Sequence, residues 1–119
     1  MKIKVLKVEP KKEPEVIEIE DTLKNLQELV GGYIEYVFPF NDDVAIIDNE
    51  EGKLIGLEPN RRLQDDVLVG TFLIVGVTDD GENTSLTDEQ IKIYTDRFME
   101  PEDFGEDFDV DDYMDFKII

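Results

Sequence analysis

The run from Val67 to Val77 is the most apolar stretch of the chain, and it constrains the fold more than any other segment. Its centre, residues 71–75, reads TFLIV and is framed by Gly70 and Gly76. A short run of branched and aromatic residues between glycines is typical of a buried strand. The run falls well short of the roughly 20 residues that a membrane-spanning helix needs. The sequence therefore predicts a buried strand here, and we expect no membrane segment.

Two alternating segments at the N-terminus predict a β-hairpin. Lysine alternates with apolar residues over residues 1–8, and glutamate does so over residues 15–20. The segment EPKKEPE lies near their junction and supplies a turn, so lysines would face glutamates across the strand pair, which is a favourable arrangement. The first segment has neither the apolar core nor the cleavage site of a signal peptide, and the chain has no cysteine. We therefore expect a cytoplasmic protein.

Two helices are predicted by their capping signals and by the spacing of their apolar residues. The first spans residues 23–30, LKNLQELV, and ends at Gly31. The second begins at Ser85 or Thr87, and Gln90 stands at capping-box spacing from Thr87. It would end near residue 98 and carry Ile91, Tyr94 and Phe98 on one face.

The middle of the chain predicts further strands. Residues 33–40 and 44–47 are rich in aromatic and branched side chains, and the turn residues NDD between them indicate a second hairpin. We expect a short strand at residues 53–57 and a loop at residues 58–60. Because strands and helices do not alternate strictly, the class indicated is α+β, with a mainly antiparallel sheet and two α-helices.

The formal net charge of −19 over 119 residues is densest near the C-terminus. Residues 100–115 hold nine carboxylates and no base. We therefore divide the chain into one domain, residues 1–100, and an acidic, aromatic-containing C-terminal segment, residues 101–119, which is expected to pack on the domain at least in part. Blocks of like charge usually stay solvated and often act as interaction surfaces. Nucleic acid and anionic membranes would be repelled, so the expected partner is a basic protein surface, such as that of a DNA-binding enzyme.

The size of the charge is comparable with that of a nucleic acid of similar length. A compact chain of this length has a diameter of about 35 Å. Duplex DNA carries one charge per roughly 1.7 Å of axis, so a duplex of that length would carry on the order of 20 charges. Because many proteins are acidic only for solubility, both mimicry of DNA and simple solubility are open interpretations.

Large apolar residues are interleaved with the acids of the C-terminal segment. In one interpretation, Phe104 and Phe108 pack one helical turn on the domain. Alternatively, Met114, Phe116 and Ile118 form the inner face of a last strand. In a second interpretation, the aromatic residues are anchors inside an acidic rim that grips a basic groove. The residues expected to contact the partner are Glu102, Asp103, Glu106, Asp107, Phe108, Asp109, Asp111, Asp112, Tyr113 and Asp115.

The residue inventory argues against the common kinds of active site. The chain has no histidine, no cysteine and a single serine, Ser85, so neither a nucleophile triad nor a zinc site can be assembled. The scattered glycines match no nucleotide-binding motif, and a calcium loop starting at Asp107 would need glycine and glutamate where Asp112 and Ile118 stand. Paired catalytic carboxylates need two different environments in a deep pocket, and no pair stands out. We expect no enzymatic activity, no cofactor and no metal.

Asn60, Arg61 and Arg62 form the one basic island in the middle of the chain. They could bind an anion or a carboxylate, which makes Asn60 and Arg61 secondary candidates for a binding site. More often, such residues after a proline cap a turn and form salt bridges with nearby acids.

Several segments, in order, resemble an uncharacterised family. They are residues 1–8, the stretch DTLKNLQELVGGYIEYVFPF, the stretch NEEGKLIGLEPNR, the strand GTFLIVG, and SLTDEQI followed by YTDRF. Together they resemble a domain-of-unknown-function family carried by phages, plasmids and conjugative elements of Gram-positive bacteria. The resemblance covers about residues 1–100 and implies a genomic setting, with no catalytic residue to carry over.

Charge and setting together favour a non-enzymatic acidic protein of a mobile element. Its carboxylates would mimic nucleic-acid phosphates and block a basic cleft of a host DNA-handling or defence protein, such as a restriction or CRISPR nuclease. One alternative is a structural or regulatory adaptor that binds, or self-associates, through an apolar sheet surface with Tyr33, Tyr36 and Phe38. Another is a small-ligand domain that uses the loop of residues 49–62.

Overall fold

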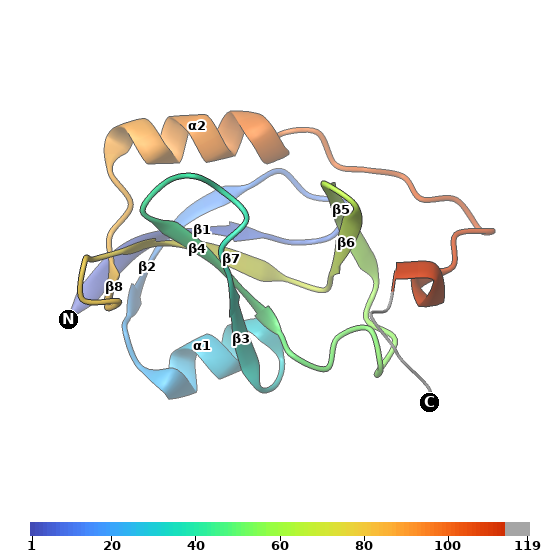
Figure 1. Ribbon diagram of the computed structural model, residues 1–119, viewed down its shortest axis with the longest axis horizontal. Coiled ribbons are helices and arrows are strands. Elements are labelled where there is room, and N and C mark those ends of the chain that lie inside the picture. The colour runs from blue at the N-terminus through green and yellow to red at the C-terminus, as the bar shows by residue number, and fades with distance from the viewer. Residues whose placement is uncertain (114–119) are drawn as a thin grey trace.

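The computed structural model describes residues 1–113 and has the α+β architecture that the sequence predicts. A six-stranded antiparallel sheet has the order β2-β1-β7-β4-β3, with β8 paired to β7, and β5 and β6 form a second, two-stranded sheet. Helix α1 covers one face of the larger sheet and helix α2 covers the other (Figure 1). The elements are β1 (Lys2–Val8), β2 (Glu15–Glu20), α1 (Leu23–Val30), β3 (Ile34–Val37), β4 (Val44–Asn49), β5 (Pro59–Leu63), β6 (Asp66–Val69), β7 (Phe72–Val77), β8 (Asn83–Thr84), α2 (Asp88–Phe98) and the short 3-10 helix η1 (Val110–Tyr113).

Coverage on both faces explains why β7 has no polar residue and why β4 is apolar over its first four residues. Because side chains alternate along a strand, Phe72 and Ile74 of β7 pack on the side of α2, whereas Leu73 and Val75 pack on the side of α1. The domain therefore has two hydrophobic cores separated by one sheet.

The N-terminal hairpin is confirmed, together with its charge pairing. Strands β1 and β2 are antiparallel neighbours, and their register places Lys2 opposite Glu20 and Lys4 opposite Glu18. Lys7 lies opposite Glu15, and their Nζ and Oε1 atoms are 3.2 Å apart. The alternation of lysine and glutamate thus sets a register in which opposite charges face each other.

Both helices begin and end at the predicted signals. Gly31 ends α1 with a φ of 82°, a left-handed conformation that glycine adopts without strain. Thr87 is the cap of α2, and it forms the reciprocal capping box with Gln90. Ser85, the alternative cap, instead accepts a hydrogen bond of 2.9 Å from the backbone N–H of Lys4.

The apolar run of residues 67–77 is not one strand, as the sequence predicted, but two strands in different sheets. The break falls at Gly70, which has a φ of 69° and donates its N–H to the carbonyl of Glu58 over 2.7 Å. A positive φ turns the chain sharply, so β6 pairs with β5 while β7 enters the centre of the larger sheet.

The prediction for residues 53–60 is wrong in both parts. Residues 50–56 form consecutive turns instead of a strand, because the N–H of Leu57 reaches the carbonyl of Gly52 over 3.0 Å. Strand β5 begins at Pro59, where a loop was predicted. It is fixed there by Asn60, whose side-chain amide donates to the carbonyls of Val8 and Gly70.

Substitution of Gly70 by alanine is expected to cost about 2–4 kcal/mol of unfolding free energy. The positive φ alone costs about 1–2 kcal/mol for an L-residue. An added Cβ would also lie 2.6 Å from Cδ1 of the half-buried Leu57, so that side chain would have to move. Gly31→Ala is the matched control, since Gly31 also has a positive φ but has no atom within 4 Å of the added Cβ. Equal losses of stability in urea denaturation for the two variants would contradict the steric part of this account.

Candidate functional site

The C-terminal segment is held against strand β5 by Glu102. Its carboxylate accepts a hydrogen bond of 2.8 Å from the backbone N–H of Arg62 and one of 3.0 Å from Nη1 of the same residue. The guanidinium of Arg62 also lies 4.6 Å from the ring centre of Phe104 and 5.6 Å from that of Phe108. These contacts anchor the segment through an ion pair and through cation–π stacking on one arginine.

The aromatic residues of the segment pack on one another, but Phe104 and Phe108 do not form the predicted helical turn. Their ring centres are 4.6 Å apart, and Phe108 stacks on Tyr113 at 5.5 Å. The backbone between the two phenylalanines is not helical, because Gly105 has a φ of 73° and donates its N–H to the side chain of Asp103. The helical turn lies later, at η1. Met114, Phe116 and Ile118 lie outside the described residues.

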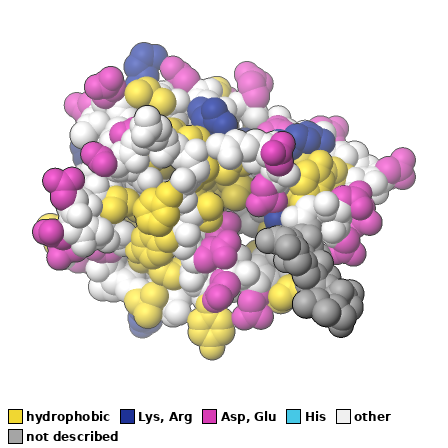
Figure 2. Space-filling view, in the orientation of Figure 1, with side chains coloured by type: hydrophobic (Ala, Val, Ile, Leu, Met, Phe, Trp, Pro, Cys, Tyr) yellow, Lys and Arg dark blue, Asp and Glu magenta, His cyan; other side chains and the backbone are white. Residues whose placement is uncertain are grey.

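Most carboxylates of this segment point into solvent. Within residues 101–113 only Glu102 takes part in an ion pair. Figure 2 shows acidic side chains along the edge of the molecule where the segment runs. Phe108 and Tyr113 are half-buried beneath the acids, and Asp115 lies outside the described residues. The exposed carboxylates are Asp103, Glu106, Asp107, Asp109, Asp111 and Asp112.

The structure places Asn60 and Arg61, the secondary candidates, in the interior. Arg61 is 1% exposed and its side chain makes five hydrogen bonds. The acceptors are the backbone carbonyls of Phe98, Lys12 and Asn60 and the side-chain oxygen of Asn60. Burial lowers the pKa of Arg61. All five N–H groups of the guanidinium therefore have acceptors inside the fold. Arg61 thus connects β5 to the C-terminal end of α2 and to the turn between β1 and β2, where Lys12 lies.

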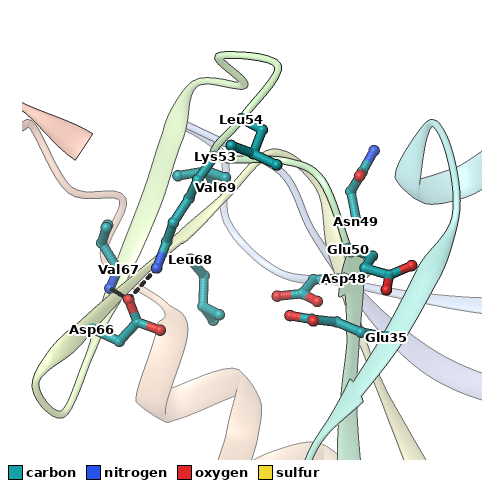
Figure 3. Close-up of a pocket in the computed structure, with 10 residues that line it drawn as sticks. All are labelled: Glu35, Asp48, Asn49, Glu50, Lys53, Leu54, Asp66, Val67, Leu68 and Val69. Atoms are coloured by element: carbon teal, nitrogen blue, oxygen red, sulfur yellow. Dashed lines mark hydrogen bonds and ion pairs between the residues drawn. The ribbon is translucent and has the colours of Figure 1, made fainter. Parts of the chain in front are cut away.

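A cavity of about 370 Å³ lies between the β3–β4 pair and strand β6 (Figure 3). Its polar wall is acidic, and its apolar wall comes from β6 and from the turns after β4. The lining residues are Glu35, Asp48, Asn49, Glu50, Lys53, Leu54, Asp66, Val67, Leu68 and Val69.

Asp48 is the most unusual residue of this cavity. It is 8% exposed, and its Oδ1 atom is buried without a hydrogen-bond partner among the described residues. Figure 3 shows its carboxyl group beside that of Glu35, with both side chains directed into the space that faces β6. Burial, followed by the neighbouring charge of Glu35 and the hydrogen bond between the two carboxyl groups, together raise the pKa of Asp48 to about 8.

Lys53 is the cation of the cavity, and it is already engaged. It forms an ion pair with Asp66 and donates a hydrogen bond of 2.9 Å to the backbone carbonyl of Tyr113. The C-terminal segment therefore lies against the same side of the molecule as the cavity. The charge of Lys53 is directed to Asp66 and to a carbonyl, and the neighbouring carboxyl groups of Asp48 and Glu35 have no cation bonded to them among residues 1–113.

Sequence reasoning did not single out the carboxyl pair of this cavity, although four lining residues, Asn49, Glu50, Lys53 and Leu54, lie in the loop of residues 49–62 that it named for a small-ligand function. The two carboxyl groups come from separate strands, and neither Glu35 nor Asp48 stands out in a chain with 31 acids. One signal was present, because Asp48 directly follows the buried run Val44–Ile47 on a central strand. An acid that continues such a run is more often buried than one in a turn.

Apolar side chains are exposed at the edge strand β3 and near the turn after β4. Tyr36 and Phe38 stack with ring centres 6.4 Å apart, and Phe38 is 62% exposed. Tyr36 also donates a hydrogen bond of 2.9 Å to the side chain of Asn83. Tyr33, Leu54 and Ile55 are exposed as well. This is the apolar surface that an adaptor function would use.

The chain belongs to the family described as domain of unknown function DUF3846, whose model matches residues 1–99. No curated protein and no solved structure matches it. Within residues 1–113, no group of three or more histidine, cysteine, aspartate or glutamate side chains is placed to hold a metal ion. None of the helices in that part of the chain is long and apolar enough to cross a membrane.

Proposed function

We propose that this protein is a non-enzymatic acidic binding protein, and that its C-terminal segment imitates nucleic-acid phosphates in the basic cleft of a DNA-handling protein. The observation that carries the proposal is the set of six exposed carboxylates within residues 103–112, none of them ion-paired among the described residues. Glu102 and the stacked aromatic residues attach this segment to β5. Part of the conformational entropy that the segment would lose on binding is therefore already lost on folding.

The dimensions of the molecule support the same proposal. Its longest extent is 40 Å. Duplex DNA of that length carries on the order of 20 charges at one per roughly 1.7 Å. The net charge of −19 is of the same size. Attraction over this distance would steer a basic protein toward the acidic segment and speed its association.

The target that we favour is a host defence protein, such as a restriction or CRISPR nuclease, met in the cytoplasm. A protein of a mobile element benefits from blocking such an enzyme, and enzymes of this kind hold nucleic acid in basic clefts. The occupied cleft would exclude DNA, so inhibition would be competitive with duplex DNA and would weaken as salt screens the charges.

Immobilised wild-type protein is expected to retain a nucleic-acid-binding protein from a bacterial lysate at low salt. Duplex DNA and about 0.5 M salt should both release it, because both act on charge contacts. A variant with the six exposed carboxylates of residues 103–112 changed to amides should not retain it. The proteins retained at low salt are eluted with duplex DNA and identified by mass spectrometry.

A second variant of identical net charge is the control. It carries six amide substitutions elsewhere on the exposed surface and should retain the same protein as the wild type. Equal retention by both variants, or retention that duplex DNA does not reverse, would contradict the proposal. The substituted positions of this control are Glu13, Glu18, Glu28, Asp79, Asp80 and Glu82.

An adaptor that binds through β3 is the second candidate, and the exposure of Tyr33, Tyr36 and Phe38 favours it. Binding through apolar area is insensitive to charge screening. Retention of a partner that persists in high salt and is lost in a Phe38→Ser variant would support the adaptor function in place of mimicry.

A further inference from the structure

The cavity between β3, β4 and β6 has the properties of a binding site rather than of a packing defect. Its volume of about 370 Å³ falls in the range of small-molecule pockets, roughly 300–1,000 Å³. A buried polar atom without a partner costs about 1–3 kcal/mol, so folded proteins seldom leave one. Oδ1 of Asp48 is such an atom, and Asp48 is one of the residues that line this cavity. A hydrogen-bond donor that enters the cavity would satisfy it.

The charges around the cavity select for a cation. Four lining residues are acids, Glu35, Asp48, Glu50 and Asp66, and Lys53 is the single base among the ten lining residues. Lys53 is held by Asp66, which leaves the pair of Glu35 and Asp48 for a ligand. An anion would meet repulsion from this pair, and the described residues offer no group of three ligands for a metal ion.

The arrangement of the two carboxyl groups favours a planar cation with several donors. Glu35 and Asp48 lie side by side on neighbouring strands, and both are directed into the cavity (Figure 3). A guanidinium presents N–H groups in a fixed plane and can bond two oxygens at once. It is also more weakly hydrated than an ammonium group, so entering a partly closed cavity costs it less. The alkyl stem of such a ligand would lie against Leu54 and Leu68.

We propose that this cavity binds an alkylguanidinium group, held by the carboxylates of Asp48 and Glu35. The group can belong to a free small molecule or to an arginine side chain of a protein. This inference rests on the residues that line the cavity and does not depend on the proposed mimicry of phosphates by the C-terminal segment.

Binding would be coupled to loss of a proton. Near neutral pH the carboxyl of Asp48 is protonated, because its pKa is raised to about 8. A guanidinium favours the ionised form, so the proton leaves to the buffer as the cation enters. The charged groups that face Asp48 are Glu35 on β3, Lys53 in the turn after β4 and Asp66 on β6. Affinity is therefore expected to rise about tenfold for each pH unit between roughly 6 and 8.

Titration calorimetry with butylguanidinium on the full chain tests the proposal. A small ligand with eight heavy atoms is expected to bind with a Kd on the order of 0.1–1 mM at pH 8. Butylammonium should bind at least about tenfold more weakly, since it is a more strongly hydrated point charge without a planar fork. The heat measured in two buffers of different ionisation enthalpy should reveal release of about one proton at pH 7.

The Asp48→Asn variant should lose the site while keeping the fold. Its affinity for butylguanidinium is expected to fall at least about tenfold, and both the pH dependence and the proton release should disappear. Asp65→Asn is the matched control, because Asp65 is exposed and does not line the cavity. It should bind as the wild type does. No saturable binding at millimolar butylguanidinium, or equal binding by Asp48→Asn, would overturn the proposal, and so would equal binding of butylammonium.

A peptide with one central arginine flanked by glycines distinguishes the two sources of the group. Binding of this peptide as tight as that of butylguanidinium, or tighter, assigns the cavity to an arginine of a partner protein. Binding of butylguanidinium with exclusion of the peptide assigns it to a free small molecule.

Discussion

Arg61→Met is expected to remove about 3–5 kcal/mol of unfolding free energy. Methionine can fill the space of the arginine stem, but it has no N–H group. The carbonyl group of Phe98 and the side-chain oxygen of Asn60 would each lose a donor in a buried site, and the carbonyl group of Lys12 would lose one in a partly buried site. Each stranded acceptor costs about 1–3 kcal/mol. Since a domain of this size is stable by roughly 5–15 kcal/mol, this loss is a large fraction of its total stability.

Arg62→Met is the matched control on the same strand. The side chain of Arg62 is 50% exposed and makes one ion pair, with Glu102, plus stacking on Phe104 and Phe108. Surface ion pairs and exposed cation–π contacts contribute about 0–1 kcal/mol each, so the loss should stay below about 1.5 kcal/mol. Urea denaturation followed by circular dichroism measures both variants. Equal losses of unfolding free energy in the two variants would show that the buried hydrogen bonds of Arg61 contribute no more to stability than the exposed contacts of Arg62.

Asp48→Asn is expected to stabilise the protein by about 2–4 kcal/mol at pH 8 and to leave its stability nearly unchanged at pH 4. An ionised carboxyl is costly in the cavity wall, whereas an amide is neutral and can still bond to Glu35. The full shift of the Asp48 pKa from an ordinary value to about 8 corresponds to roughly 6 kcal/mol. The expected gain is smaller because the amide also loses hydration on burial.

The sign of the pH dependence follows from the direction of the pKa shift. The folded state holds a proton on Asp48 that the unfolded state has lost at any pH between the unfolded pKa, about 4, and the folded pKa of about 8. This group therefore makes the wild type less stable as pH rises through that window, by at most about 1.4 kcal/mol per pH unit. The difference in unfolding free energy between Asp48→Asn and the wild type should grow across the same window. Acids that titrate alike in the two proteins contribute nothing to this difference.

The Glu35→Gln variant tests how much of the raised pKa of Asp48 comes from the charge of Glu35 and how much comes from burial. Burial is the largest cause and the charge of Glu35 is a lesser one, so this variant should recover only part of the gain of Asp48→Asn. A gain from Glu35→Gln that equals or exceeds that of Asp48→Asn would indicate that repulsion, not burial, dominates. A loss of stability in Asp48→Asn at pH 8 would contradict the raised pKa itself.

The parts of the fold that could be predicted from the sequence are those fixed by local signals. The lysine and glutamate alternation predicted the β1–β2 pair, and the caps at Gly31 and Thr87 predicted the helix ends. Each signal lies within a few residues of the structure that it specifies. The α+β class followed from the order of these elements.

The errors occur where distant residues decide the local structure. Strand β5 exists because Asn60 and Arg61 bond to Val8, Lys12 and Phe98, which are far away in the chain. Apolar residues lie on both sides of Gly70 in the run of residues 67–77, so periodicity does not mark the turn there, where Gly70 packs against Leu57. Similarly, the cavity depends on the pairing of β3 with β4, which brings Glu35 opposite Asp48.

The candidate partner surface was predictable in composition but not in arrangement. The acids of residues 102–112 were recognised by charge alone. The structure adds that Glu102 is used to hold the segment on Arg62, and that Phe108 and Tyr113 lie half-buried beneath the exposed acids. The partner itself stays a prediction.

The affinity of the retained partner, measured against salt concentration for the wild type and for the six-amide variant of residues 103–112, tests the central claim most directly. Mimicry of phosphates predicts that wild-type affinity falls steeply as salt rises, that duplex DNA competes, and that the variant binds at least about a hundredfold more weakly at low salt. Affinity that is flat in salt, unaffected by duplex DNA and equal in the variant would contradict the claim.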